Sequence, residues 1–417
     1  MKRKHVNEKN KENDKNKLKQ KNKKLEKEKN EDITNNSQNT NFHKPKKKFN
    51  FRKFKIILIL IFIFIIVLAI LAGYSISSWQ NLARDMIFNS SSTVLDSDGK
   101  VIAKIGSSKK TKNIPLSQMP NNLVNAYISI EDQRFYSHKG VDLPRTGAAI
   151  FSYLKNMGSS SFGGSSITQQ LVKNLTGDNS SSITRKVKEW IKAFALEDIL
   201  DKKEILQAYL NIIYVGPNIY GVGTGSNYYF NKEVENLSLA ECAFLAGINN
   251  SPNSYNPFGK NNNSEKIKTR TKTVLSKMLE LNYINESDYA SAISEIDKGL
   301  NFKQGKIEDS AKNTIYSYHT DSLLNQIIED ISNKRNISKE FATNYIEMSG
   351  LKIYSTQNQN IQTKIEQELS NPKYIIKSQK DSSVTAQAAM VVLDHKNGYV
   401  LGCVRRNWKK RNLSWSK

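Results

Sequence analysis

The feature that most constrains this chain is an uncharged apolar stretch of nineteen residues, from Ile56 to Tyr74. As an α-helix it would be about 28 Å long, at about 1.5 Å per residue, which matches the hydrocarbon thickness of a bilayer. The sequence therefore predicts a transmembrane helix over residues 56–74. Because the stretch is long and no small-residue cleavage pattern follows it, we expect a retained anchor and not a cleaved signal peptide.

Basic residues crowd the N-terminal side of this stretch. Residues 1–55 hold 20 basic and 7 acidic residues, more than half of the chain's net charge of +24. This tail contains too few apolar side chains to form a core, so we expect it to be disordered. The tail either binds an anionic leaflet of the membrane or only solvates the N-terminus. Few aromatic residues interleave with its lysines, which argues against binding of nucleic acid. The positive-inside rule places it in the cytoplasm and residues 75–417 outside.

The part of the chain after the apolar stretch has a mainly helical pattern. We read residues 75–96 as a membrane-proximal connector and residues 97–300 as a mainly α domain. Apolar side chains at helical spacing predict a helix over Asn121–Ile130. Two capping boxes, Asp201 with Glu204 and Ser238 with Glu241, predict the starts of two helices. Gly247 predicts the end of the second helix.

Residues 301–417 predict a linker and the incomplete start of a second, α+β part. Helical pattern resumes after the linker, and short alternating apolar runs predict strands around Gly350–Gln357 and Ala386–Val404. The two cysteines, Cys242 and Cys403, lie too far apart in sequence to form a disulfide framework or a four-cysteine zinc site. Neither covalent nor zinc scaffolding is therefore expected.

The first candidate site is a pair of adjacent acidic residues, Glu131 and Asp132, at the C-terminal end of a predicted helix. The helix dipole and burial both disfavour a negative charge there, which makes one of the two a candidate general base. Because adjacent side chains on a helix point in different directions, only one of them should face a shared cleft. A solvated helix end is the alternative that composition leaves open.

The second candidate site is a helix start rich in glycine and hydroxyl groups, residues 163–174. Ser166, Gln170 and Lys173 fall at i, i+4 and i+7, so we expect one helical face with a hydroxyl, an amide and an ammonium group. Such a face near a helix N-terminus suits a phosphate, although the spacing is not that of a Walker P-loop. The alternative is an ordinary polar helix face.

The third candidate site is an Arg185–Glu189 pair, four residues apart on a predicted helix. We expect the buried face of this helix at Val187, Ile191 and Phe194. A surface ion pair is the plain explanation. Arginine before glutamate is the weaker orientation, however, and such pairs stabilise a helix by only about 0.2–0.5 kcal/mol. A gain in stability therefore hardly explains the pair.

In this order and spacing, the three sites resemble motifs of peptidoglycan glycosyltransferase family 51, the glycosyltransferase module of class A penicillin-binding proteins and of monofunctional enzymes. The resemblance covers about residues 95–300. Its further motifs are Ile205–Asn211, Tyr214–Phe230, and Leu239–Gly247 leading to Pro252 and Tyr255-Asn256-Pro257. It implies a mainly α fold with a lysozyme-like lobe and a small membrane-proximal jaw. It also implies polymerisation of lipid II into peptidoglycan glycan strands, with inversion and release of a polyprenyl diphosphate, in cell-wall biogenesis.

The resemblance also implies roles for individual residues. Glu131 would be the base that deprotonates the 4-hydroxyl of the incoming lipid II sugar, and Glu189 the second catalytic residue. The substrate-binding residues that it implies are Asp132, Phe135, His138, Ser165, Ser166, Gln169, Gln170, Lys173, Arg185 and Lys186. No cofactor is firmly implied, and a divalent cation, Mg²⁺ or Mn²⁺, held by Glu189 is left open.

The implied partners are lipid II, the growing lipid-linked glycan strand and membrane lipids, with other cell-wall synthesis and division proteins as further candidates and no nucleic acid. A substrate with its lipid tail in the bilayer explains an anchor in the cell membrane and predicts exposed apolar side chains in the jaw. The candidates are Phe151, Tyr153, Leu154, Met157 and Phe162.

The end of the chain departs from the family pattern. Gly350–Thr356 and Ala386–Val404 resemble the approach to a penicillin-binding transpeptidase domain, but the last thirteen residues, six of them basic and none acidic, do not. No Lys-Thr-Gly occurs, and the early Ser-x-x-Lys at Ser107–Lys110 precedes the glycosyltransferase motifs. We therefore expect a chain truncated at the start of that domain, without transpeptidase activity.

Two other functions stay open at this point. An unfinished second part could leave a non-catalytic remnant or a scaffold in a wall-building complex. A lysozyme-like glycan hydrolase is favoured less, because a hydrolase has no pyrophosphate for a cationic, hydroxyl-bearing helix face to hold.

Overall fold

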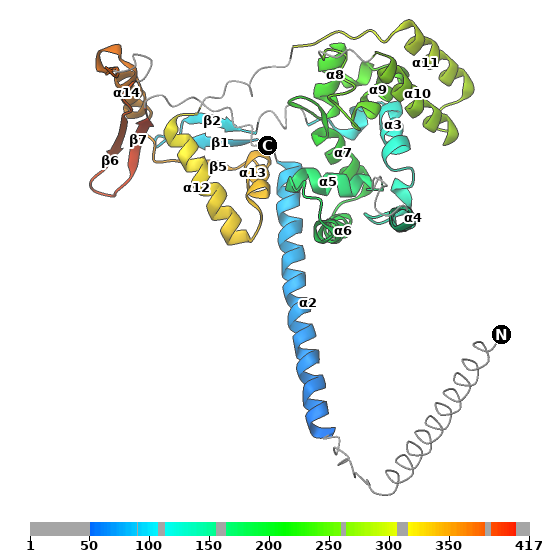
Figure 1. Ribbon diagram of the computed structural model, residues 1–417, viewed down its shortest axis with the longest axis horizontal. Helices are drawn as coiled ribbons and strands as arrows, with labels where there is room; N and C mark the ends of the chain where they lie inside the picture. The colour runs from blue at the N-terminus through cyan, green and yellow to red at the C-terminus, as the bar shows by residue number, and fades with distance from the viewer. Residues whose placement is uncertain are drawn as a thin grey trace, which may run out of the picture. The chain divides into compact units, whose positions relative to one another are not determined.

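The computed structural model describes residues 51–89, 91–106, 113–155, 164–259, 264–306, 316–379 and 385–405. The chain divides into two units, residues 1–69 and 70–417, which are described separately. In the first unit the described residues form the N-terminal part of helix α2 (Phe51–Phe88) (Figure 1). Of the predicted disordered tail, residues 1–55, the first fifty lie outside the described residues. The prediction is wrong for residues 51–55, which form the first turn of α2. Among the described residues, no helix is both long and apolar enough to cross a membrane.

The second unit is mostly helical, as predicted for the mainly α domain. Its helices up to residue 300 are α3 (Asn121–Glu131), α4 (Leu143–Lys155), α5 (Ile167–Thr176), α6 (Ile183–Glu197), α7 (Lys202–Ile212), α8 (Val222–Phe230), α9 (Leu239–Ile248), α10 (Ser264–Glu280) and α11 (Glu286–Lys298). Between them lie the short 3-10 helices η1 (Leu116–Gln118), η2 (Phe135–Ser137) and η3 (Val234–Asn236), and a hairpin of β3 (Tyr214–Gly216) and β4 (Ile219–Tyr220).

The predicted helix starts are confirmed. Asp201 caps α7 and Ser238 caps α9, each in a complete capping box with the glutamate three residues later. The stop predicted at Gly247 is wrong, because α9 continues to Ile248. A Cβ atom on Gly247 would lie 3.2 Å from the Arg270 side chain, so this glycine allows α9 and α10 to pack closely.

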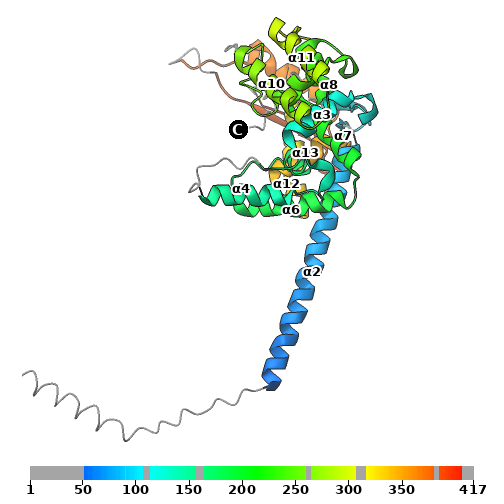
Figure 2. The same cartoon turned by 90° about the vertical axis from the view of Figure 1, so that its right-hand side faces the viewer.

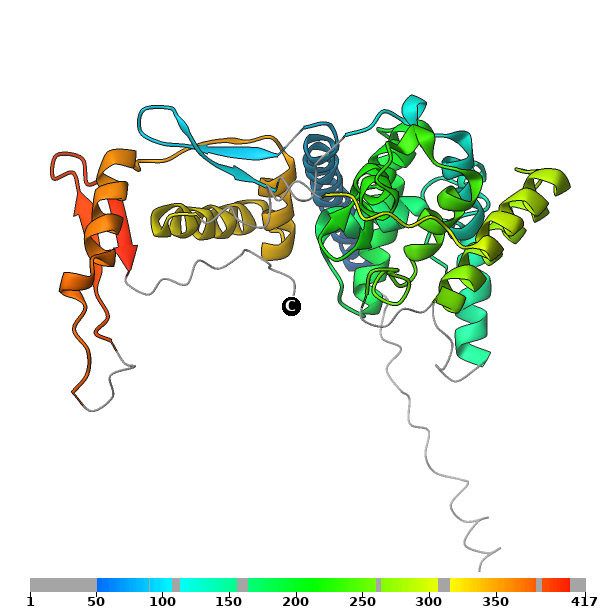
Figure 3. The same cartoon turned by 90° about the horizontal axis from the view of Figure 1, so that it is seen from above.

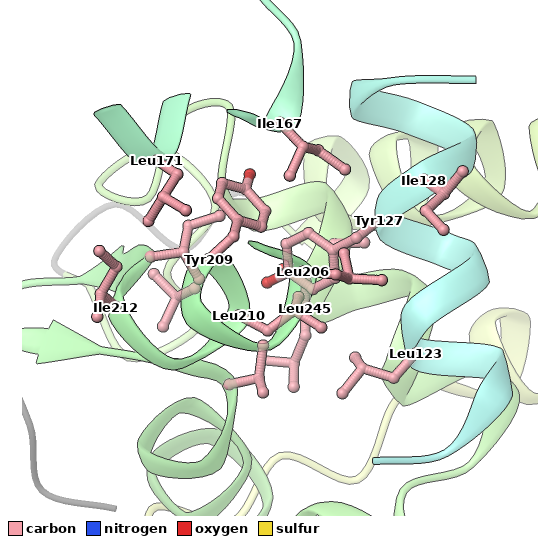
Figure 4. Close-up of a cluster of buried hydrophobic side chains, with 14 of the residues drawn as sticks. Leu123, Tyr127, Ile128, Ile167, Leu171, Leu206, Tyr209, Leu210, Ile212 and Leu245 are labelled. Carbon is pink, nitrogen blue, oxygen red and sulfur yellow. Dashed lines mark hydrogen bonds between the residues drawn. The ribbon is translucent and has the colours of Figure 1, made fainter. Parts of the chain in front are cut away.

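The core of this helical part is built around α9, in which every residue from Ala240 to Ile248 is buried. Tyr127 of α3 and Tyr209 of α7 meet edge to face there, with ring centroids 6.1 Å apart (Figure 4). The Tyr127 hydroxyl also donates a hydrogen bond of 2.9 Å to the carbonyl of Leu245 in α9. Helix α3 is therefore held against α7 and α9 close to its last residue.

A second, smaller core lies between a three-stranded sheet and two helices. The sheet has the order β2–β1–β5, with β1 (Ser92–Leu95) antiparallel to β2 (Val101–Ile105) and parallel to β5 (Lys352–Tyr354). Helices α12 (Tyr318–Arg335) and α13 (Lys339–Met348) lie beside the sheet (Figure 3), and their side chains pack against it. The Ser355 hydroxyl donates to the carbonyl of Leu95, 260 residues earlier, at 2.8 Å. This sheet thus joins segments from both sides of the helical domain.

The described strands after residue 350 confirm the two predicted strand regions. They are β5 in the first, and β6 (Ala389–Leu393) and β7 (Val400–Arg405) in the second. Helix α14 (Gln359–Ser370) packs on β7, and η5 (Pro372–Tyr374) follows it. Strand β1 lies in the predicted connector, and β2 lies just after it. Neither strand was predicted, because β5, the parallel partner of β1, is far away in sequence.

Helix α13 also belongs to the main core of the helical domain. Its Phe341 packs on Trp79 of α2, with ring centroids 5.6 Å apart. The side-chain amide of Asn344 donates to the carbonyl of Leu175, at the end of α5, at 3.1 Å. The domain boundary near residue 300 stays a prediction, and these contacts cross it.

Candidate active site

The carboxylate of Glu131, the last residue of α3, accepts hydrogen bonds from two neutral amides. Gln170 Nε2 lies 2.8 Å from Oε2, and Asn249 Nδ2 lies 2.9 Å from Oε1. The Tyr209 hydroxyl lies 2.9 Å from Gln170 Oε1 and 3.3 Å from Asn249 Nδ2. Glu131 is half-buried, so its carboxylate is held in place and is still partly accessible.

Asp132, the other member of the acidic pair, has no exposed surface. It accepts hydrogen bonds from His138 Nε2 at 3.0 Å and from the backbone N–H of Ile167 at 3.0 Å. Asp132 therefore fixes the start of α5 while Glu131 alone is accessible, which agrees with the expectation that adjacent side chains diverge.

A second group of predicted residues gathers around the carboxylate of Glu189 in α6. Gln169 Nε2 donates to Oε1 at 2.9 Å, and Arg185 donates to Oε2 at 2.5 Å. Lys186 Nζ also donates to Oε1, and it bonds the hydroxyl of Ser165 at 2.7 Å. Burial lowers the pKa of the Lys186 amine, although its hydrogen bond to Glu189 opposes this shift.

Helix α5 connects these two groups. Gln169 bonds Glu189 in one direction, and its neighbour Gln170 bonds Glu131 in the other. Lys173 lies one turn further along α5, is exposed, and acts electrostatically on Lys186. The three cations Lys173, Arg185 and Lys186 thus lie on the two helices next to an accessible carboxylate. Such an arrangement can hold an anionic group beside a proton acceptor.

Several predicted substrate-binding residues are buried. Those with no exposed surface are Asp132, Phe135, Ser166 and Gln169. The predicted face with Ser166, Gln170 and Lys173 is wrong for Ser166, because Ser166 is the N-cap of α5 and its hydroxyl also donates to the carbonyl of Gly140. Phe135 packs in the core under the ammonium group of Lys202, 4.4 Å from the ring centre. Direct substrate contact by these four residues stays a prediction that their burial does not favour.

The predicted orientation of α6 is wrong. Val187, Ile191 and Phe194, expected on its buried face, are 43, 48 and 39% exposed, whereas Glu189 is only 5% exposed. The carboxylate can be buried because two cations and an amide satisfy it. The helix therefore turns Glu189 inward together with Ala193 and Leu196, and it turns Val187, Ile191 and Phe194 outward.

Two polar residues of the site were missed from the sequence. Tyr209 was counted among the apolar residues of a capped helix, and Asn249 follows the expected stop of the next motif. Tyr209 lies in one of the motifs that carry the family resemblance, and Asn249 lies two residues after another. Only the fold brings their polar groups to Glu131, from 78 and 118 residues away in sequence.

The residues around Glu189 do not fit a divalent cation. Both carboxylate oxygens already accept hydrogen bonds from cationic or amide groups. In the part of the chain that the structure describes, no group of three His, Cys, Asp or Glu side chains is arranged to hold a metal ion. A hollow of about 480 Å³ lies elsewhere, among residues that include Asn113, Gln118 and Glu233. The candidate site is therefore identified by the hydrogen bonds and charges around Glu131 and Glu189, and not by a cavity.

The part of the chain that holds this site matches known proteins. The family model described as Transglycosylase matches residues 98–279. Penicillin-binding protein 1A of Clostridium botulinum (strain Hall) is 36% identical over 326 residues, which cover 77% of this chain and 39% of that protein. Penicillin-binding protein 1A of Vibrio cholerae is 40% identical over 212 residues, which cover 51% of this chain and 25% of that protein.

The chain spans about two fifths of the length of the Clostridium relatives that it matches. The crystal structure of penicillin-binding protein 1A from Haemophilus influenzae overlaps with a TM-score of 0.30 and 20% sequence identity, covering 67% of this chain and 28% of that one. This score is too low to bear on the fold.

Proposed function

We propose that this chain is a peptidoglycan glycosyltransferase, because residues 98–279 match the Transglycosylase family model and the chain is similar to penicillin-binding proteins 1A. Its substrates are lipid II and the growing lipid-linked glycan strand. The reaction adds disaccharide-peptide units to that strand and releases a polyprenyl diphosphate. The observation that supports this proposal best is the pair of hydrogen bonds by which α5 links Glu131 to the cationic group around Glu189.

In the proposed reaction Glu131 acts as the general base. Its carboxylate takes the proton of the 4-hydroxyl of the incoming sugar, and that oxygen attacks the anomeric carbon of the growing strand with inversion. The bond to the diphosphate breaks, and the leaving group carries the developing negative charge. Lys173, Arg185 and Lys186 supply positive charge for it, fixed before the reaction begins. Glu189 positions two of these cations.

The proposal includes an anchor in the cell membrane with the helical domain outside the cytoplasm, for which the apolar residues 56–74 and the basic tail are the support. Exposed apolar side chains on α4 and α6, helices that run in similar directions in Figure 2, support contact with the bilayer. Phe151 on α4 is 70% exposed and Ile183 on α6 is 84% exposed. The other jaw candidates, Tyr153, Leu154, Met157 and Phe162, lie outside the described side chains.

The test is polymerisation of lipid II by the full chain in detergent, with glycan length read on a gel. Glu131→Gln should lower the rate by about 10²–10⁴-fold, the usual contribution of a general base, and keep the thermal melting temperature. Glu265→Gln, an exposed glutamate on α10, is the matched control. A folded wild-type chain that makes no polymer would instead favour the scaffold or remnant, and cleavage of lipid-free glycan would favour the hydrolase.

A further inference from the structure

Asn249 stands at the C-terminal end of α9 and contacts the carboxylate of Glu131 directly. Its backbone has helical angles, φ −53° and ψ −32°, and every residue of the helix from Ala240 to Ile248 is buried. Its Nδ2 atom lies 2.9 Å from Glu131 Oε1 and 3.3 Å from the Tyr209 hydroxyl oxygen. An asparagine amide has two N–H groups, so one can point to each oxygen.

These contacts close a ring of hydrogen bonds with a defined direction. The Tyr209 hydroxyl accepts from Asn249 and donates its own proton to Gln170 Oε1 at 2.9 Å. This contact turns the amide of Gln170 so that its Nε2 faces Glu131 Oε2 at 2.8 Å. Burial, together with the charge of Glu131, raises the pKa of Tyr209, so the phenol keeps the proton that it donates. Every donor in the ring finds an acceptor, and both carboxylate oxygens are held.

We propose that Asn249 is a positioning residue for the base, and that its hydrogen bond sets the direction of the Glu131 carboxylate and favours its charged form. The inference rests on the proposed function, since it assumes that Glu131 is the base. Neutral donors bound to a carboxylate stabilise its charged form and leave other lone pairs free for the proton of the substrate. Asn249 acts through Glu131. Among the charged groups from neighbouring elements, the Arg145 guanidinium of α4 donates to the Glu131 backbone carbonyl at 2.6 Å. The charge of Glu131 also acts on Tyr127 and Tyr209, and burial together with this charge raises the pKa of both phenols.

The substitution Asn249→Ala removes one of these donors and suits the helical backbone angles of the position. The acid limb of the pH–rate profile should move up by about one pH unit, because a single hydrogen bond to a charged group has roughly that strength. At low pH kcat should fall about tenfold while KM changes little. Asn249→Asp places a second carboxylate against Glu131 and should move the acid limb further in the same direction.

The matched control is Asn250→Ala, since Asn250 is the next residue, is exposed, and has a side chain without a hydrogen-bond partner in the described part of the chain. Its profile should coincide with that of the wild type. If Asn249→Ala gives the same acid limb as Asn250→Ala while Glu131→Gln is inactive, the positioning role is refuted and the proposed function stands.

A second measurement does not depend on activity. In the full chain with ¹³C-carboxyl glutamate, the infrared band of Glu131, assigned by its loss in Glu131→Gln, can be titrated with pH. Asn249→Ala should raise the midpoint, and an unchanged midpoint refutes the role whatever the activity. If Asn249→Ala raises the midpoint but the wild-type chain makes no polymer, the positioning of Glu131 is retained and the glycosyltransferase function is rejected. Only samples with a cooperative thermal transition are compared.

Discussion

The Nε2 atom of Gln170 lies 2.8 Å from Oε2 of Glu131, so the middle of helix α5 is tied to the last residue of α3. The residue before Gln170 bonds Glu189 on the neighbouring helix. A single helix of ten residues therefore sets the distance between the candidate base and the group of cations. Rate and substrate affinity should respond separately to changes on its two sides.

Gln170→Leu should lower kcat for lipid II polymerisation by about tenfold to a hundredfold. The variant removes a hydrogen bond to a charged group, worth about 1.5–3 kcal/mol, and tenfold corresponds to about 1.4 kcal/mol. Asn174→Ala, one turn further along the same helix, is the control and should keep the rate. Equal rates for the two variants would show that Gln170 is not needed to hold the base.

Lys186→Met should raise KM for the lipid-linked substrate more than it lowers the melting temperature. Lys186 is one of the three cations on α5 and α6, and Glu189 keeps its hydrogen bonds from Arg185 and Gln169 when Lys186 is lost. Steady-state kinetics and thermal melting separate the two effects.

The control for this substitution is Lys188→Met, an exposed lysine of the same helix. If the Lys186 variant loses stability but keeps its KM, Lys186 serves the fold and does not bind the diphosphate.

The outward apolar side of α6 should contact acyl chains when the full chain is in a lipid nanodisc. A fluorophore on Ile191→Cys should be quenched by lipids with acyl-chain nitroxides, and one on the exposed Lys188→Cys should be quenched much less. The two native thiols are buried, and burial raises the pKa of both, so they resist labelling. Equal quenching at the two positions would argue against this orientation at the bilayer.

The sequence predicts helix starts well because their signals are local. Asp201 and Ser238 each have their capping partner three residues away, and both caps are present. The orientation of α6 depends instead on what surrounds it. Apolar spacing predicted Val187 and Ile191 inside, but the hydrogen bonds that allow Glu189 to be buried come partly from Gln169, twenty residues earlier. In the proposed membrane setting, the bilayer also removes the usual free-energy penalty for apolar side chains that face outward.

The same limit applies to the candidate site. Glu131, Gln170 and the Arg185–Glu189 pair could be found from the sequence, because each lies in a motif of suggestive residue types. Tyr209 and Asn249 look like a core aromatic residue and a helix end. Their role depends on the meeting of α3, α7 and α9, which no short window of sequence contains.

Asp142→Asn should lower the melting temperature at pH 7, and the difference from the wild type should narrow as the pH falls below about 4. Burial alone would raise the pKa of Asp142, but the Arg145 N–H at 2.9 Å and the Arg134 guanidinium together hold the pKa below its ordinary value of 3.8. Because folding lowers this pKa, the ionised group stabilises the folded state above the unfolded pKa. That stabilisation is lost as the pH falls through the folded pKa.

The control is Asp98→Asn, at an exposed turn. Its melting temperature should differ little from that of the wild type at either pH. A difference for Asp142→Asn that stays constant between pH 7 and pH 3 would mean that ionisation of this carboxyl does not stabilise the fold.

Asn344→Leu should destabilise the helical domain and slow polymerisation, although residue 344 lies far beyond the matched residues 98–279. The Asn344 amide donates to the carbonyls of Asn174 and Leu175, at 3.3 and 3.1 Å, where α5 ends. Carbonyls at a helix end have no partner within the helix, and leaving one buried without a donor costs about 1–3 kcal/mol. A looser end of α5 would also loosen Gln170, so the rate should fall together with the melting temperature. Thr343→Ala changes a half-buried residue of the same helix, whose hydroxyl donates within that helix, and it should alter neither. If Asn344→Leu behaves like Thr343→Ala in both measurements, the contacts of α13 do not support the site, and the activity resides in the matched residues alone.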